Sequence, residues 1–393
     1  MKFETYKIAD LIDEISMGPF GSNIKVECFV DDGIPVLNGS NLDGIALSEN
    51  SFRYVTEEKA DSLGKANASR GDVVITHRGT LGQISFIPQN SKYSRYVISQ
   101  SQFRVRCNEK LLPEYLVYYF HTRVGQHKLL ANASQVGVPA LARASTTFQT
   151  IEIETPPIED QRKIVGILET IREKIELNNA INNNLLEQAV ALYKKMCPFS
   201  VDSDLPQDWR VGTVGEIIDI HDSKRIPLSG KERDQMENKI YPYYGAASLM
   251  DYVDNYIFDG KYLLLGEDGT VVDDKGYPIL QYVWGKFWVN NHAHILTGSN
   301  GFNVESLYVL FKQTSVASIV TGAVQPKISQ ANLRSIKVVI PPKSIIEAYN
   351  DQVEPIFSLI RANEDFNSLL FQVRDALLPK LMSGELDVSD VEI

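Results

Sequence analysis

The chain has 393 residues, 44% of them hydrophobic, and carries a formal net charge of −11 at pH 7. This length and composition predict a globular protein of two or three domains. Since no run of eighteen apolar residues occurs, we expect no membrane span. The acidic charge argues against non-specific binding of polyanions. However, the last 51 residues alone carry 10 acidic and 4 basic side chains, so a local nucleic-acid-binding surface elsewhere is not excluded.

The N-terminus and the cysteines bear on the compartment of the protein. The first residues are charged and polar, unlike a secretory signal. Cys28, Cys107 and Cys197 are odd in number and far apart, which predicts neither a disulfide framework nor a zinc-ligand spacing. We therefore expect free thiols in a reducing cytoplasm.

Residues 1–157 form the first of two regions that we predict to be mixed α/β. Short runs rich in β-formers, separated by Gly, Pro, Asn and Asp, occur at Val73–Thr76, Ile84–Ile87 and Phe103–Arg106. A helix is predicted over Pro113–His121. These elements are enough for one small domain.

The end of this region is repeated. Residues 137–157 read GVPALARASTTFQTIEIETPP, and residues 322–342 read GAVQPKISQANLRSIKVVIPP, an ungapped alignment at an offset of 185. The helical segments that follow keep this offset. The chain is therefore expected to consist of four segments: a variable region at 1–157, a helix at 158–198, a second variable region at 199–342, and a second helix with a tail at 343–393.

Both helical segments carry a seam of apolar and amide side chains at alternating spacings of three and four, as in a helix that packs against another helix. About 38 residues give a rod of roughly 57 Å. Such a rod is too long for one small core, so we expect the two helices to pair. We expect a kink or an irregular turn at Pro355. The predicted seam positions are Ile164, Leu168, Ile171, Ile175, Asn178, Asn182, Leu185, Val353, Ile356, Ile360, Asn363, Asn367, Leu370 and Leu377.

The four asparagines of this seam are predicted to cluster, because polar seam residues fix the register of paired helices at a cost in stability. The alternative is that they face solvent. In the second variable region, strands are predicted at Tyr262–Leu265 and Phe287–Val289, and a helix at Val304–Lys312. A Gly-Thr pair follows a predicted strand in each region, at Gly79-Thr80 and at Gly269-Thr270.

Three stretches carry a resemblance to a known family. They are Pro156-Pro157-Ile158-Glu159-Asp160-Gln161-Arg162-Lys163-Ile164 at the start of the first helix, Leu205-Pro206-Gln207-Asp208-Trp209, and the tail Leu377–Leu386. With the tandem repeat, these resemble the specificity subunit of type I restriction–modification enzymes, although the second Pro-Pro copy is less faithful.

The resemblance implies two target-recognition domains, each reading one half of a bipartite sequence in double-stranded DNA. The helices would form an antiparallel coiled coil that sets the spacing of the half-sites. Two modification subunits that hold S-adenosylmethionine would dock on this scaffold, joined by restriction subunits that use ATP and magnesium. This chain itself would be non-catalytic and hold no cofactor.

The sequence is consistent with that absence. It contains neither a phosphate loop ending in Gly-Lys-Ser/Thr nor the Asn-Pro-Pro-Tyr/Phe tetrapeptide of adenine methyltransferases. Two other classes stay open: a coiled-coil structural adaptor with peptide-binding domains, and an enzyme with unrecognised catalytic residues.

Two motifs have more than one reading. Glu267-Asp268-Gly269-Thr270 resembles part of a magnesium site, but a nuclease needs more carboxylates, and the matching stretch His77-Arg78-Gly79-Thr80 has none. A turn that presents side chains to DNA, or a structural hairpin, is favoured. His292 and His294 are expected on one face of a strand. A metal would need a third ligand, and none is evident, so we predict no metal site.

Base recognition uses Arg and Lys for guanine, Asn and Gln for adenine, and Ser or Thr for either. In the first region the candidate loop residues are Lys25, Asn38, Ser40, Asn41, His77, Arg78, Thr80 and Gln135. In the second region they are Lys224, Arg225, Tyr244, Asp268, Thr270, Asn290, Asn291, Gln325 and Lys327.

Overall fold

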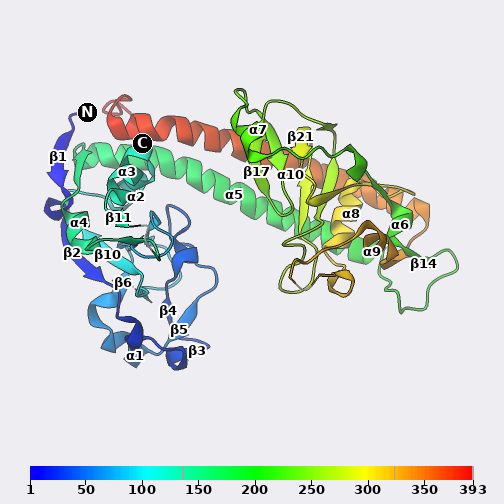
Figure 1. Ribbon diagram of the computed structural model, residues 1–393, viewed down its shortest axis with the longest axis horizontal. Helices are drawn as coiled ribbons and strands as arrows, with labels where there is room; N and C mark the ends of the chain where they lie inside the picture. Colours follow the sequence, from blue (N-terminus) through cyan, green and yellow to red (C-terminus); the bar gives the residue numbers. More distant parts are fainter. Residues whose placement is uncertain (135–136, 323, 392–393) are drawn as a thin grey trace. The chain divides into compact units, whose positions relative to one another are not determined.

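The computed structural model describes residues 1–134, 137–322 and 324–391 (Figure 1). The chain divides into two compact units. The first unit combines Met1–Glu176 with Asn367–Ile393, and the second is Leu177–Phe366. Each unit thus contains one variable region together with part of both long helices, and the first unit combines two separate stretches of the chain.

The first unit is built on two sheets. The central sheet is antiparallel and consists, in spatial order, of β2 (Ile12–Met17), β10 (Gln102–Cys107), β7 (Val73–Thr76) and β8 (Ile84–Phe86). The second sheet consists, in spatial order, of β3 (Phe29–Val30), β5 (Arg53–Val55), β4 (Ile34–Val36), β9 (Arg95–Val97) and β6 (Asn67–Ser69). Its β4 and β9 run parallel. The predicted strands are confirmed, with bounds shifted by one residue at most.

Two short strand pairs and four short helices complete this unit. The pairs are β1 (Glu4–Lys7) with β13 (Glu152–Thr155), and β11 (Ala133–Ser134) with β12 (Ala140–Leu141). The helices are α1 (Glu57–Ser62), α2 (Pro113–His121), α3 (Arg123–Leu130) and α4 (Ala144–Gln149). Helix α2 has the predicted bounds. Pro113 occupies its first turn, a position that proline favours, and this explains where the helix begins. Its Tyr115, Leu116 and Phe120 are fully buried in the core of the unit.

The second unit repeats this topology. Its antiparallel central sheet consists, in spatial order, of β15 (Ile218–Ile220), β22 (Ala293–Gly298), β19 (Tyr262–Gly266) and β20 (Leu280–Val283). Its second sheet consists, in spatial order, of β17 (Leu249–Val253), β16 (Tyr241–Tyr244), β21 (Lys286–Val289) and β18 (Phe258–Asp259), again with one parallel pair, β16 and β21. Strand β14 (Arg210–Thr213) pairs with β23 (Lys337–Ile340). The short helices of this unit include α6 (Val214–Ile217), α7 (Gly230–Asp234), α8 (Val304–Phe311) and α9 (Gln330–Ser335). The internal repeat therefore extends through the variable regions.

The ungapped alignment at an offset of 185 is wrong in the loop that precedes α4 in the first unit and α9 in the second. Backbone bonds from Leu141 N–H to the carbonyl of His77, and from Ile328 N–H to that of Glu267, are equivalent in the two units. They align residue 141 with residue 328, an offset of 187. Strands β13 and β23 keep the offset of 185. The connection from these bonds to the strand is thus two residues shorter in the second copy, 328–337 against 141–152, which the ungapped alignment concealed.

The long helices begin directly after each Pro-Pro pair. Helix α5 spans Ile158–Met196 and α10 spans Lys343–Ser383. In the first unit, fully buried Gln161 anchors α5, because its side chain accepts from Leu112 N–H at 3.0 Å and donates to the carbonyl of Lys110 at 2.9 Å. This contact explains one position of the Pro-Pro motif. Helix α10 continues without interruption through Pro355, contrary to the expected irregularity.

Within the second unit, α5 and α10 pack antiparallel. Asn363 donates to Asn182 at 2.8 Å, and further along, Tyr349 OH donates to the carbonyl of Ala189 at 3.1 Å. Residue numbers rise on α5 as they fall on α10, which defines the antiparallel direction. In the first unit, Ile164 and Leu168 share a core cluster with Leu378 and Leu381.

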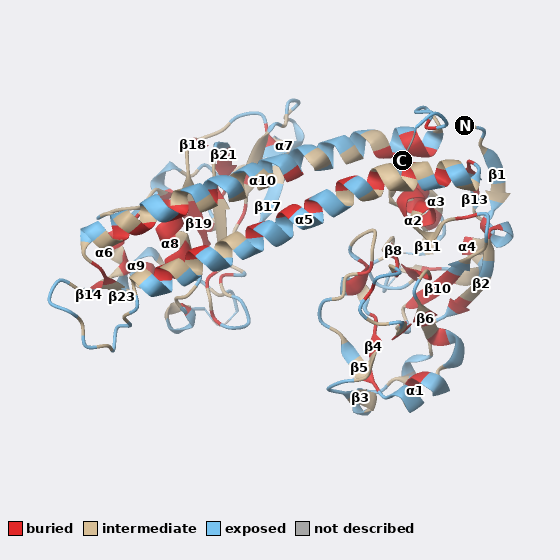
Figure 2. Cartoon of the chain, turned by 180° about the vertical axis from the view of Figure 1, so that it is seen from behind, coloured by how far each residue is buried: buried red, intermediate tan, exposed pale blue. Residues whose placement is uncertain are grey.

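The seam residues fall into two groups by burial, and Figure 2 shows buried positions recurring along both helices. The buried ones are Ile164, Leu168, Ile171, Ile175, Asn178, Asn182, Val353 and Asn367. The half-buried ones are Leu185, Ile356, Ile360, Asn363, Leu370 and Leu377. Phe357 and Leu378 are buried instead, each one residue after a predicted seam position. The reason is that a helix with 3.6 residues per turn drifts away from a strict spacing of three and four.

The asparagine pair in the second unit gives a test of the seam. Replacing Asn182 alone by leucine should destabilise the protein by about 1–3 kcal/mol, because the amide of Asn363 loses its acceptor and Glu364 loses a donor. Adding Asn363→Leu should recover the part of that loss that comes from the Asn363 amide, since both partners of that hydrogen bond are then apolar. Urea unfolding followed by tryptophan fluorescence measures both. Equal stability of the single and double variants would show that the pair is not coupled.

None of the helices among the described residues combines the length and hydropathy needed to cross a membrane. Cys28, Cys107 and Cys197 are free thiols and half-buried. Burial raises the pKa of Cys107 and of Cys197, to about 11 for the latter, so both are protonated at pH 7.

Candidate nucleic-acid interface

The predicted DNA-contacting residues of the first unit gather around one end of its central sheet. Strands β2 and β7 end there and β10 begins there, so their loops meet. His77 N–H donates to the carbonyl of Ser101 at 2.8 Å, and Gly18 N–H donates to that of Gln102 at 2.8 Å. A Cβ on Gly18 would lie 1.9 Å from the carbonyl oxygen of Ser99, so these loops pack backbone against backbone.

The turn after β7 presents its side chains outward. Gly79 has a φ of +91°, a conformation that favours glycine, and its N–H donates to the carbonyl of Pro139 at 2.9 Å. Arg78 and Thr80 on either side are exposed. Among the ion pairs of the described residues, none involves Arg78, so its guanidinium is available to a ligand.

The other candidates of this unit differ in their accessibility. Lys25, Asn38 and Ser40 are exposed. Asn41 is fully buried and donates to the carbonyls of Ser48 and Asn50, which makes its role structural. Gln135 lies outside the described residues.

His77 is half-buried beside Arg78. Its Nε2 lies 3.2 Å from the carbonyl oxygen of Gln100, so this nitrogen carries the proton of the hydrogen bond. Burial lowers the pKa of His77, which leaves its ring neutral at pH 7. It positions the loop rather than adding charge to it.

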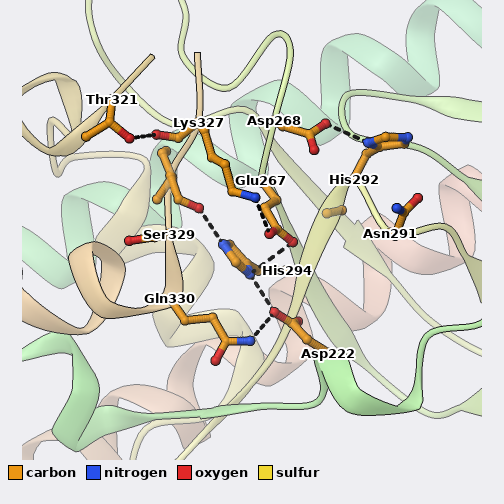
Figure 3. Close-up of polar contacts among 12 residues, drawn as sticks. Asp222, Glu267, Asp268, Asn291, His292, His294, Thr321, Lys327, Ser329 and Gln330 are labelled. Atoms are coloured by element: carbon orange, nitrogen blue, oxygen red, sulfur yellow. Dashed lines mark hydrogen bonds and ion pairs between the residues drawn. The ribbon is translucent and has the colours of Figure 1, made fainter. Parts of the chain in front are cut away.

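The second unit has the same turn after β19. Gly269 has a φ of +83°, and its N–H donates to the carbonyl of Pro326 at 3.0 Å, as Gly79 does to Pro139. Two residues before this glycine stands Glu267, where the first unit has His77. Around it lies a polar network (Figure 3).

This network is centred on Asp222 and Glu267. Asp222 Oδ2 lies 2.6 Å from His294 Nδ1, and Asp222 Oδ1 accepts from Ile295 N–H at 2.9 Å. Arg225 donates to Glu267 at 2.6 Å and lies 3.6 Å from Asp222. Lys327 pairs with Glu267 at 3.2 Å. Burial raises the pKa of each carboxyl, but these donors and cations outweigh it and hold both values below the ordinary range.

The ligand atoms of Asp222, Glu267 and His294 lie within 4.8 Å of one another, a grouping that could hold a metal ion. However, both nitrogens of His294 face acceptors, since Nε2 lies 2.8 Å from the carbonyl oxygen of Ile328. Arg225 and Lys327 already compensate the carboxylates. A metal ion would displace these bonds, so the arrangement is better suited to joining three loops.

His292 and His294 were expected on one face of a strand, but they do not lie on the same strand in the structure. His294 is fully buried within β22, whereas His292 precedes that strand and its Nδ1 lies 2.6 Å from Asp268 Oδ1. The carboxylate of Asp268 is therefore already paired with the nearby side chain of His292.

The remaining candidates of the second unit again divide by exposure. Lys224, Thr270, Asn291, Gln325 and Lys327 are exposed. Arg225 turns inward, with a side chain only 14% exposed and with further bonds to the carbonyls of Asn291 and Ala293. Asn290 is buried, and its Oδ1 accepts from His292 N–H. Tyr244 is half-buried in a cavity described below.

The sequence analysis did not single out Arg143. It is exposed, has a φ of +47°, and follows Leu141, whose N–H is bonded to His77. A non-glycine residue in this conformation is uncommon and often marks a functional loop. Sequence periodicity carries no signal for such a position.

Comparison with known proteins identifies the family. A family model described as the type I restriction modification DNA specificity domain matches residues 2–187 and, a second time, residues 206–358. The chain belongs to this family. The two matches each contain one variable region, which agrees with the structural repeat. The family resemblance carried by the Pro-Pro and Leu-Pro stretches is therefore confirmed.

Individual specificity subunits are similar over most of the chain. The type I restriction enzyme MjaIX specificity subunit of Methanocaldococcus jannaschii is 24% identical over 423 residues, covering 99% of this chain and 94% of that protein. The HindI specificity subunit of Haemophilus influenzae is 20% identical over 412 residues, covering 82% of this chain and 88% of that protein. The type I restriction–modification S subunit of M. genitalium shares the fold, with a TM-score of 0.55, 17% identity, and coverage of 97% of this chain and 96% of that one.

Proposed function

We propose that this specificity-family chain recognises a bipartite sequence in double-stranded DNA, with each unit reading one half. The observation that supports this most directly is the repeated loop edge. The same glycine turn and the same backbone bonds recur in both units, while the exposed side chains differ, Arg78 and Thr80 in one and Thr270 and Lys327 in the other. One scaffold with two sets of side chains suits the reading of two different half-sites.

Catalysis is assigned in this proposal to partner subunits. Two modification subunits would supply S-adenosylmethionine-dependent methylation, and restriction subunits would use ATP and magnesium. The acidic and histidine side chains grouped in the second unit are engaged in hydrogen bonds and ion pairs, which supports a non-catalytic role for them.

The long helices are proposed to set the gap between the half-sites and to carry the modification subunits. Their similar lengths, 39 residues in α5 and 41 in α10, support this role. The seam positions of the two helices also keep a constant offset of 185 in the sequence, while the variable regions have diverged.

Selection from random genomic fragments tests the proposal. The purified chain, with and without its modification subunit, should enrich one motif made of two short words separated by a fixed gap. A structural adaptor would enrich no sequence in either case. A self-sufficient enzyme would modify or cleave DNA without any partner.

Arg78→Ala is expected to weaken DNA binding through the first unit. If Arg78 contacts a base, the loss should be about 1–3 kcal/mol and should relax one motif position. If it contacts a phosphate, all sequences should weaken alike and the salt dependence should fall by about one unit. Binding measured at several salt concentrations separates these results. Lys7→Ala, which removes an exposed cation on β1, is the matched control; unchanged binding of Arg78→Ala would exclude the contact.

A further inference from the structure

The second unit contains an aromatic cavity of about 340 Å³, whose lining includes one of the DNA-contact candidates, Tyr244. Its walls are the rings of Tyr244, Tyr282, Trp284, Tyr308 and Phe357, contributed by β16, β20 and the residue after it, α8 and α10. Helix α5 supplies Asn182 and Leu186, and α10 also supplies Glu364. All these residues belong to the same compact unit.

The aromatic rings of the cavity lie close enough to contact one another. The centroid of Tyr282 lies 5.5 Å from that of Trp284, 5.9 Å from that of Tyr308 and 5.3 Å from that of Phe357. Tyr308 and Phe357 meet edge to face at 6.1 Å. Trp284 Nε1 donates to Asp365 Oδ1 at 3.0 Å, which fixes the indole ring. The cavity is thus preformed, with aromatic faces as its walls.

The charge around the cavity is unbalanced. Within the described part of the chain, no cation lies within ion-pair distance of Glu364 or Asp365; Glu364 accepts only the amide of Asn182, at 3.0 Å. The nearby cations Lys261 and Arg361 are taken up by two other carboxylates, Glu305 and Glu354.

One lysine shows that these rings attract cations. Lys312 Nζ lies 5.6 Å from the centroid of the Tyr308 ring, within the range of a cation–π contact. Lys312 lines the neighbouring cavity and not this one. Burial together with the charge of Glu364 raises the pKa of Tyr308 to about 12, so this phenol stays neutral and does not add to the negative charge.

We infer that this aromatic cavity with its uncompensated Glu364 binds the guanidinium group of an arginine side chain from a partner protein. The inference rests on the proposed function, because that partner would be a modification subunit. A planar guanidinium stacks on aromatic faces and pairs with a carboxylate at its edge, which a compact ammonium does less well. Nucleic acid is disfavoured as the occupant, since Glu364 and Asp365 repel phosphates.

A small probe tests the cavity without any partner. The full chain contains three tryptophans, so ¹⁵N-tryptophan labelling gives three indole N–H signals, and Trp284→Phe identifies that of Trp284. N-acetyl-arginine amide should shift this signal saturably. N-acetyl-citrulline amide, of the same shape but neutral, should not. Equal shifts by both probes, or no shift at high probe concentration, would overturn the inference.

Assembly with the modification subunit tests the natural occupant. Glu364→Gln keeps the acceptor for Asn182 but removes the charge, and should weaken the affinity for that subunit by about tenfold. Trp284→Phe should weaken it less, and melting curves confirm that both variants fold. Glu347→Gln, an exposed carboxylate earlier on α10, is the control and should bind normally.

These experiments separate the two ideas. If the wild-type complex forms and recognises its DNA while Glu364→Gln assembles with unchanged affinity, the arginine cavity is rejected and the proposed function stands. If the wild-type chain binds neither DNA nor a modification subunit, the proposed function fails. A saturable shift of the Trp284 signal by the arginine probe would then still support the cavity as a guanidinium site.

Discussion

Replacing Asp222 by alanine is expected to destabilise the second unit by about 3–5 kcal/mol, because it leaves the buried His294 ring, the Ile295 N–H and the Arg225 guanidinium without a shared acceptor. Asp222 has a side chain 5% exposed and accepts from the Ile295 backbone and from Gln330, besides contacting His294 and Arg225. A typical domain is stable by only about 5–15 kcal/mol, so this loss would be a large fraction of the total.

Tryptophan fluorescence during urea unfolding measures the stability of the second unit, which contains Asp222. Trp209, Trp284 and Trp288 all lie in the second unit, so the signal reports on it alone. Asp219→Ala, at an exposed position of β15 three residues before Asp222, is the matched control and should change stability by less than about 0.5 kcal/mol. Similar stabilities for the two variants would mean that the network does not hold the loops.

The network also predicts a dependence on pH. Burial raises the pKa of Asp222, but the hydrogen bonds of His294 and Ile295 prevail, so its folded value lies below its unfolded value of about 3.9. A depressed carboxyl pKa contributes stability that is present above pH 4 and is lost as pH falls through the folded value. Unfolding of the wild type should therefore become easier below pH 4, and Asp222→Ala should show a weaker dependence in that range.

Elements governed by local periodicity could be predicted from the sequence. A run of β-formers marked Val73–Thr76, and the proline at the first turn marked α2, because strand and helix patterns are local. The long helices followed from seam spacing and from the Pro-Pro pairs. The family followed from the same stretches.

The direction of loop side chains could not be predicted. Arg225 was expected to face a ligand, yet it lies three residues after Asp222 across the short 3-10 turn Asp222–Lys224 and points back into the unit. Asn41 is likewise drawn inward by two carbonyls. Such directions depend on partners distant in the sequence, such as Glu267 for Arg225, and no local pattern reveals them.

The repeat alignment failed for a related reason. Identities at the glycine and at the prolines favoured an ungapped match, whereas the backbone bonds of residues 141 and 328 show that the connection to the following strand is two residues shorter in the second copy. Insertions in a surface loop cost little free energy. A loop that reads DNA can therefore change length while the strands that hold it stay in register.

Grafting Ile8–Ile151 from another member of the family is expected to replace one complete half of the recognised sequence and leave the other half unchanged. The boundaries follow from the structure, since β1 and β13 pair directly outside this segment and Ile8 N–H donates to the carbonyl of Ile151 at 2.9 Å. The graft thus keeps the strand pair and the helices of the recipient. The loop edge with Arg78 and Thr80 lies wholly inside the graft, whereas that with Thr270 and Lys327 lies wholly outside it.

The donor segment must also fit the recipient helix. In the first unit, Tyr118 OH donates to Glu169 at 2.7 Å, and Gln161 bonds the residues that precede α2, so a donor with equivalent residues at these contacts should be chosen. Mapping methylated positions in DNA treated with the complete complex gives the motif. A recipient reconstituted with its own segment at the same junctions is the control. Because the two loop edges belong to separate compact units, changing one should not alter the bases read by the other; a graft that altered both halves would contradict independent reading.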